Sequence, residues 1–173
     1  MIDSDTRKRV AVALLTLSAA GFGAWQTQEG WSSVPIIPTK GDVPTIGHGS
    51  TRYEDGTPVK MTDPPITRQR GAQLARGLAR EDEAAVIKSL PGVWLTQTEF
   101  DVYVNFTGQF GQGNWRKSSM RRYLLAGEYR AACDALLRYR YSAGFDCATP
   151  GNKVCYGVWT RQQKRHQACT EAL

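Results

Sequence analysis

The chain has 173 residues and a mass of 19.2 kDa, which suits one compact domain and excludes a large modular protein. With 41% apolar and 22% charged residues it can bury a core, so an intrinsically disordered protein is excluded as well. The net charge of +6 favours a polyanionic partner such as nucleic acid, acidic lipid or an acidic cell wall.

The first element is an uncharged segment over residues 10–28, which follows the basic cluster RKR at residues 7–9. This charge pattern is typical of an export segment whose N-terminus stays in the cytoplasm while the rest of the chain is sent outward. Its apolar part, Val10 to Trp25, has 16 residues and is shorter than the roughly 20 that usually cross the hydrocarbon. We therefore expect a weak anchor that can leave the inner membrane.

Two alternatives stay open for this segment. Ser18 and Ala20 form the small-residue pair of a signal-peptide cleavage site, so a cleaved signal is one of them. The other is a buried N-terminal helix of a soluble protein, since sixteen apolar residues also fit a core helix. The division that we expect is an anchor over residues 1–28 and one domain over residues 29–173.

The domain itself divides into a β-rich lobe and a helical lobe. From about residue 31 to 62 the chain is rich in Pro, Gly and β-branched residues, which predicts a small hairpin lobe. From about residue 63 to 173 helical spacing prevails, starting near Thr67, and Pro91 ends the first helix of this part. The expected fold class is α+β, mainly helical, with a small β-hairpin lobe.

Capping residues mark the starts of the later helices. Thr96 and Glu99 have the spacing of a capping box, ahead of an apolar stripe that predicts a core helix. Ser118 or Ser119 is expected to cap the next helix, and Thr160 is expected to cap the last one.

All four cysteines lie in the last 41 residues. In an exported protein this even count predicts two disulfides, and we expect Cys147 to pair with Cys155 and Cys133 with Cys169. A zinc site that uses His166 and cysteines is one alternative, although the spacings are irregular and no CxxC pair occurs. Buried free thiols in a cytosolic protein are the other.

Positive charge is concentrated in the C-terminal third. Residues 114–173 hold 11 basic and 4 acidic side chains, whereas residues 1–113 hold 11 and 12. This third is the expected anion-facing surface, and a solvated helix face is the alternative.

Several separated motifs point to a known family. They are EG at 29–30, VPTIGHGST at 43–51, FGQGNWRKSSM at 110–120, AGEYRAACDALLRY at 126–139 and CYGVWTRQQKRHQAC at 155–169. With the weak anchor, they resemble the bacteriophage lysozymes of glycoside hydrolase family 24, and more closely the signal-anchor-release endolysins of that family. The resemblance implies a lysozyme-like fold and a muramidase that cleaves the β-1,4 bond between N-acetylmuramic acid and N-acetylglucosamine, with no metal or cofactor.

The resemblance also implies catalytic roles, with Glu29 as the general acid and Thr45 as the residue that positions the attacking water. The second carboxylate departs from the family spacing, because Pro38 and Thr39 stand where an acid is expected. Asp42 is the only carboxylate between Glu29 and Thr45, so we expect it to take this role from a displaced position. A plain turn residue is the alternative for Asp42.

The chemistry explains why these residue types are needed. An acid that protonates the leaving oxygen near neutral pH should lie in a partly desolvated cleft, which raises its pKa. If Asp42 deprotonates a water on the opposite face of the sugar, its carboxyl should stand about 6.5–9.5 Å from that of Glu29. Thr45 would hold that water through its hydroxyl.

Substrate contacts are expected from His48, Trp115 and Arg121. His48 lies between two glycines, and its alternative role is to satisfy a local backbone group. Trp115, like Trp31, either stacks on a sugar or lies in the core. Arg121 either contacts the acidic peptide stems of peptidoglycan or stays solvated.

The expected partners are peptidoglycan glycan strands, the inner membrane through residues 10–28, and a phage holin or pinholin. The protein is expected to be held inactive in that membrane, because Glu29 lies directly beyond the anchor, and to act as a monomer in the periplasm after release. No nucleic acid partner is expected, since the export segment disfavours a DNA-binding module. A catalytically impaired peptidoglycan-binding homologue is the alternative function.

Overall fold

The structure is a computed structural model that describes residues 8–38, 41–142 and 144–173 and, for Gln28 and Glu29, the backbone alone. Thr39, one of the positions where the family spacing would place an acid, lies outside these residues. In chain order the elements are β1 (Val10–Ala11), η2 (Val12–Leu14), α1 (Ala19–Glu29), β2 (Ser32–Ile36), β3 (Thr45–Gly47), α2 (Arg68–Ser89), β4 (Trp94–Leu95), α3 (Gln97–Lys117), α4 (Ser119–Leu125), α5 (Tyr129–Ala135), η3 (Leu136–Arg138), β5 (Tyr141–Ser142), β6 (Phe145–Asp146) and α6 (Tyr156–Glu171). The expected mainly helical α+β fold is confirmed.

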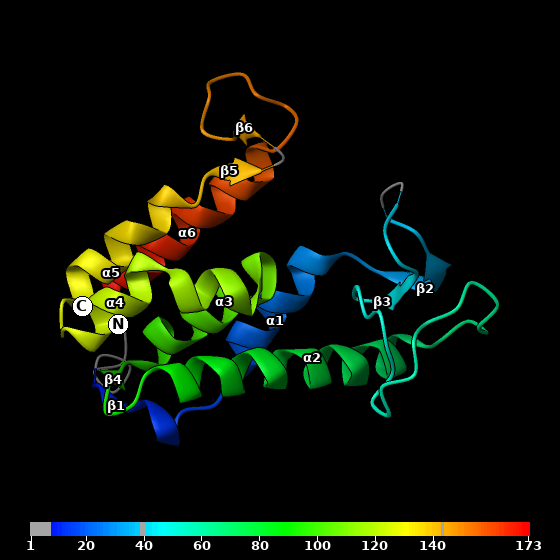
Figure 1. Ribbon diagram of the computed structural model, residues 1–173, viewed down its shortest axis with the longest axis horizontal. Helices are drawn as coiled ribbons and strands as arrows, with labels where there is room; N and C mark the ends of the chain where they lie inside the picture. The colour runs from blue at the N-terminus through cyan, green and yellow to red at the C-terminus, as the bar shows by residue number, and fades with distance from the viewer. Residues whose placement is uncertain (1–7, 39–40, 143) are drawn as a thin grey trace.

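The long helix α2 joins the two lobes (Figure 1). The β2–β3 hairpin lies at the N-terminal end of α2, and the β1–β4 pair lies beyond its other end. In the hairpin, Ser32 stands opposite Gly47 and Ile36 opposite Thr45. Further bridges between Ile46 and Ser50 and between residues 52 and 58 extend the hairpin lobe beyond β3.

The core is built around α3, which packs against α1, α2 and α6. Its first turn has the expected capping box, since Thr96 Oγ1 accepts a hydrogen bond from the Glu99 amide and Glu99 Oε2 accepts one from the Thr96 amide. Its side chains include several aromatic rings with no exposed surface, namely Phe100, Tyr103, Phe106 and Trp115. These rings make α3 the centre against which the other helices are placed.

The N-terminal segment belongs to this same core. β1 pairs with β4, and Ser18 caps α1 by accepting a hydrogen bond from the Gly21 amide. The segment has five buried apolar residues with 2–8% of their surface exposed, namely Val12, Leu15, Leu17, Phe22 and Trp25. No helix among the described residues is long and apolar enough to cross a membrane, and α1 has 11 residues. In this conformation the apolar side chains of the segment pack in the core.

The starts of the other helices agree with the expected ones, with one exception. Thr67 caps α2, which was expected to start near this residue, and Ser118, one of the two expected caps, caps α4. The expectation that Thr160 caps the last helix is wrong, because α6 begins at Tyr156. Thr160 instead lies inside the helix and donates its hydroxyl proton to the Tyr156 carbonyl at 3.1 Å, a local bond that Thr often makes in helices.

Both expected disulfides are present. Cys133 of α5 is joined to Cys169 near the end of α6, and Cys147 is joined to Cys155 across a short loop. The alternatives of a zinc site and of free thiols are therefore wrong. His166, the other ligand considered for zinc, has its Nε2 atom 2.8 Å from a carboxylate oxygen of Asp134.

Helices α1, α2 and α3 pack closely around a polar side chain, Asp82 of α2. A Cβ atom at Gly108 of α3 would overlap the indole nitrogen of Trp25 on α1 and would lie 3.3 Å from Asp82 Oδ2 on α2. Asp82 Oδ1 accepts a hydrogen bond from Gln112 Nε2 at 3.2 Å. Burial raises the pKa of the Asp82 carboxyl to about 6, although the hydrogen bond from Gln112 acts in the opposite direction. The folded protein thus disfavours the ionised form of this carboxyl.

We predict that Asp82→Asn stabilises the protein at neutral pH. The folded-state pKa lies above the ~3.9 of an unfolded aspartate, so the folded state binds the proton more tightly, and this contribution is lost as the pH rises through about 6. The amide variant should exceed the wild type by about 2–3 kcal/mol in the free energy of unfolding at pH 7 and match it near pH 4. Urea unfolding at both pH values measures this.

The control is Glu171→Gln, which neutralises an exposed acid on another helix, α6. A difference between Asp82→Asn and wild type that stays constant from pH 4 to pH 7 would contradict the assignment.

Candidate active site

The C-terminal end of α1 is held against the hairpin lobe by a side chain. α1 ends at Glu29 because Gly30 adopts φ 69°, a backbone conformation that favours glycine. The carbonyl oxygen of Gly30 lies 2.6 Å from Nδ1 of His48, which directly follows β3. The hydrogen-bonded nitrogen of His48 is the donor, because a carbonyl oxygen only accepts. His48 therefore fixes the backbone next to Glu29 relative to β3.

A groove opens beside this contact. It has a volume of about 640 Å³, and its walls come from the last turns of α1, the start of α2 and the loop after β3. The Trp31 ring lies 5.2 Å from the His48 ring, and the Arg68 guanidinium carbon lies 5.1 Å from the Trp31 ring centroid. The groove thus joins an aromatic face, a cation and an imidazole, a combination suited to a sugar that carries anionic groups.

Two glycines let α2 approach the site closely. A Cβ atom at Gly71 of α2 would overlap the ring of Trp31 and lie 3.4 Å from the Gly47 Cα atom. Gly47 of β3 has φ 67°, and a Cβ atom there would be 3.2 Å from Gly71 Cα. Glycine at both positions is therefore required for the hairpin, Trp31 and α2 to meet.

Thr45 lies at the start of β3 and is buried, with 9% of its surface exposed. Its Oγ1 atom is 3.5 Å from the carbonyl oxygen of Ile36, the residue opposite it in β2. At this distance the hydroxyl is only weakly engaged, so it retains the capacity to bind a water.

Asp42 lies in the connection between β2 and β3, and it is exposed. The β2–β3 register closes the hairpin at Ile36 and Thr45, so the carboxylate belongs to the hairpin tip and stands three residues before Thr45. Its role as second carboxylate stays a prediction.

Trp115 does not have the surroundings expected of a substrate-binding residue, and Arg121 lies away from this groove. The Trp115 side chain is fully buried and donates its indole N–H to Ser89 Oγ at 2.8 Å, so the core alternative is correct. Arg121 donates its Nε–H to the Ser89 carbonyl at 3.0 Å. Ser89 is the last residue of α2, 18 positions and therefore about 27 Å along the helix from Gly71 at the groove. Arg121 therefore lies away from this groove, and its expected contact with the peptide stems of peptidoglycan stays a prediction.

Sequence reasoning missed Arg68, which contributes the cation of the groove. It is the first residue of α2, and no local pattern distinguishes it from the other arginines of that helix. Its role depends on how α2 meets the hairpin. The predicted position of His48 in the cleft agrees with the groove, and so does its predicted alternative, a hydrogen bond to a local backbone group.

Comparison with known proteins identifies the family. The phage lysozyme family profile matches residues 26–165, most of the chain, so the protein belongs to the phage lysozyme family. The endolysin of Salmonella phage P22 is 29% identical over 133 residues, which are 77% of this chain and 88% of that protein. The SAR-endolysin of Enterobacteria phage PA-2 is 26% identical over 159 residues, which are 92% of this chain and 87% of that protein.

A solved structure supports the same assignment. The endolysin from Escherichia coli O157:H7 phage FAHEc1 has a TM-score of 0.76 and 25% sequence identity, and the match covers 92% of this chain and 96% of that chain. The predicted lysozyme-like fold and the predicted family are thus confirmed.

We predict that Gly71→Ala damages the site through Trp31. The added methyl group would overlap the indole ring, and relief of that overlap should cost about 1–3 kcal/mol in unfolding free energy. Displacement of the ring should also lower lysozyme activity. Thermal unfolding and an activity assay measure the two effects.

Gly77→Ala is the matched control, because it lies on the same helix and a Cβ atom there meets no atom within 4 Å. This control should unfold at the same or a slightly higher temperature, since alanine favours helix more than glycine does. Equal behaviour of the two variants would show that Gly71 makes no close approach to Trp31.

Proposed function

We propose that this protein is a phage endolysin that hydrolyses the β-1,4 bond between N-acetylmuramic acid and N-acetylglucosamine in bacterial peptidoglycan. The observation that carries the proposal is the contact between Gly30 and His48. It joins the residue after Glu29 to the residue three positions after Thr45, which supports a single site for the proposed acid and the water-positioning hydroxyl. Membership of the phage lysozyme family supports the same activity.

In the proposed reaction Glu29 is the general acid and gives its proton to the glycosidic oxygen as the bond to the anomeric carbon breaks. A water attacks the anomeric carbon from the opposite face of the ring and loses a proton to the carboxylate of Asp42. Thr45 orients that water with its hydroxyl. The product is a sugar with a free reducing end, and its configuration at the anomeric carbon is inverted.

The groove supplies the binding energy in this proposal. The Trp31 ring offers an apolar face on which a sugar can stack, and Arg68 offers a cation for the carboxylates of the lactyl group or peptide stem. The basic residues of the C-terminal third add a favourable field for the acidic wall polymer.

A second candidate function rests on the position of Asp42. The chain has no acid at the usual family spacing, and Asp42 is exposed at the hairpin tip. A homologue that binds peptidoglycan and no longer cleaves it would have these features. Measurement of bond cleavage separates the two functions.

We predict that Glu29→Gln lowers the release of new reducing ends from purified peptidoglycan by at least about 100-fold, because an amide is too weak an acid to protonate the leaving oxygen. Binding of the variant to insoluble peptidoglycan should persist. Wild-type protein that binds peptidoglycan but releases no reducing ends would instead establish the non-catalytic function.

The same assay assigns the second carboxylate. Loss of about 100-fold in Asp42→Asn supports a general base at the hairpin tip. Retention of wild-type activity in Asp42→Asn together with loss in Thr45→Val would remove Asp42 from the mechanism and leave Thr45 to orient the water. Asp55→Asn is a suitable control, because Asp55 is another exposed acid of the hairpin lobe.

The proposal includes a membrane-held form. In this form residues 10–28 lie in the inner membrane with the N-terminus in the cytoplasm, and the protein enters the periplasm as an active monomer after a holin or pinholin acts. The side chains that a membrane would bury are the ones that pack against α3 in the structure, Phe22 and Trp25 among them. A membrane-held chain therefore lacks α1 in the core and has no fixed position for Glu29, which accounts for its inactivity.

We predict that lengthening the segment with four leucines delays lysis. Each leucine adds about 0.3–0.6 kcal/mol of favourable insertion energy, enough to hold a marginal anchor in the bilayer. Lysis timing after expression, with membrane fractionation, measures this. The control is an insertion of four serines at the same point. Lysis by the leucine variant as early as by wild type would contradict the release model.

A further inference from the structure

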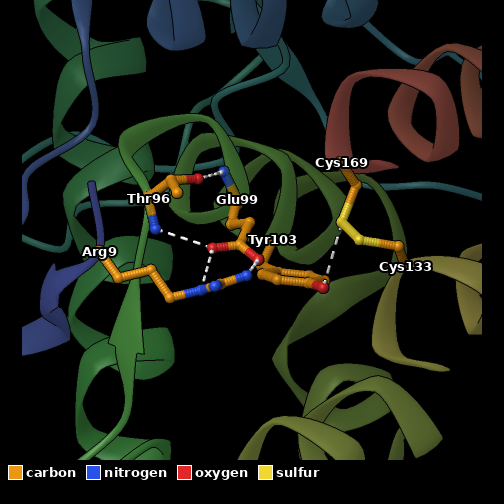
Figure 2. Close-up of polar contacts among 6 residues, drawn as sticks. All are labelled: Arg9, Thr96, Glu99, Tyr103, Cys133 and Cys169. Atoms are coloured by element: carbon orange, nitrogen blue, oxygen red, sulfur yellow. Dashed lines mark hydrogen bonds and ion pairs between the residues drawn. A yellow bond between two sulfur atoms is a disulfide. The ribbon is translucent and has the colours of Figure 1, made fainter. Parts of the chain in front are cut away.

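The N-terminal segment is attached to the rest of the protein by an ion pair as well as by its apolar side chains. Arg9, the residue before β1, donates from Nη2 to Glu99 Oε1 at 2.8 Å and from Nε to Glu99 Oε2 at 3.2 Å (Figure 2). Its guanidinium carbon also lies 3.8 Å from the ring centroid of Tyr129 on α5. One side chain thus connects the start of the chain to α3 and α5.

The partner of Arg9 is an unusual acid, because Glu99 has no exposed surface. Its Oε2 atom also accepts the Thr96 amide at 2.8 Å, as part of the capping box that starts α3 (Figure 2). Among the described residues, Arg9 is the one cation that forms an ion pair with it. A buried carboxylate that loses its cation is strongly destabilising, so α3 depends on the presence of Arg9.

Two more carboxylates outside the segment accept hydrogen bonds from its backbone. Glu83 of α2 accepts the Leu17 amide at 2.8 Å, and Asp101 of α3 accepts the Ser18 amide at 3.1 Å. These amides lie just before and at the start of α1, where helix N–H groups lack partners within the helix. Three acids in the rest of the protein thus accept hydrogen bonds from the polar groups of the segment. The hydrocarbon of a bilayer offers no such acceptors.

We propose that Glu99 is a docking receptor for Arg9, and that their ion pair completes the active fold only after the whole segment, including its basic end, has left the membrane. The inference rests on the proposed membrane-held form. There Arg9 lies on the cytoplasmic side and the rest of the protein on the periplasmic side, so Glu99 has no cation to pair with. A segment that is only partly withdrawn leaves the buried acid unpaired, which makes docking of the segment an all-or-none event.

Arg9→Met and Lys8→Met provide the test, since each removes one positive charge from the same basic cluster. Lys8 is exposed, so its loss controls for the effect of charge on membrane orientation and extraction. In the full-length protein released into solution, amide exchange at residues 11–18 should be at least tenfold faster in Arg9→Met than in wild type, and unchanged in Lys8→Met. The fraction of active soluble protein after release from the membrane should fall for Arg9→Met alone.

The double variant Arg9→Met with Glu99→Gln establishes the coupling. Glutamine at this position still completes a capping box, and it leaves no buried charge without a partner. It should therefore return the exchange of Arg9→Met toward the wild-type rate. Should Arg9→Met yield no soluble protein, recovery in the double variant supports the receptor, and failure to recover overturns it.

Equal exchange in Arg9→Met and Lys8→Met would overturn the proposal, as would strictly additive effects of the two substitutions in the double variant. Failure of the membrane-held form is seen separately. In that case wild-type protein is absent from the membrane fraction at all times, whereas the exchange measurements in solution still report whether Arg9 and Glu99 are coupled.

Discussion

The position of α1 depends on one constraint, the burial of the N-terminal segment against α3. Helices α2 and α6 cover other sides of α3, and the segment covers the remainder with apolar side chains that end at Phe22 and Trp25. Because α1 ends four residues after Trp25, the packing of that ring also determines where the backbone of Glu29 lies. The completeness of the core and the geometry of the proposed acid are therefore coupled in this protein.

At the C-terminal end of α1, the site is assembled largely from backbone atoms and small residues. Gly30 ends the helix, the Gly30 carbonyl meets His48, and Gly47 and Gly71 let the hairpin touch α2. Such contacts tolerate little change, since a single methyl group at Gly71 overlaps Trp31. Close contacts among α1, the hairpin and α2 thus determine the shape of the groove next to Glu29, and polar side chains then line it.

The features that could be predicted from sequence are those with local causes. Thr96 and Glu99 specify the start of α3 through a capping box, and the cysteine spacing indicated both disulfides. The distance of Arg121 from the groove depends on the length and course of α2, which a motif does not contain. Arg68 was missed for the same reason, since only packing brings it to Trp31. The motif around Thr45 located the hairpin, whereas the displaced Asp42 follows no family spacing.

The bridge between Cys133 and Cys169 influences how the molecule can open. It ties α5 to the last turns of α6, and both of its sulfur-bearing side chains are fully buried. α6 is also attached to α3, where Arg165 donates to the side-chain oxygen of Asn105 at 2.8 Å. A fluctuation that moves α6 away from α3 therefore moves α5 as well, because the disulfide joins the two helices. A reducing agent reaches the sulfurs only during such excursions, so the lifetime of the bridge in reductant reports how often the C-terminal third detaches.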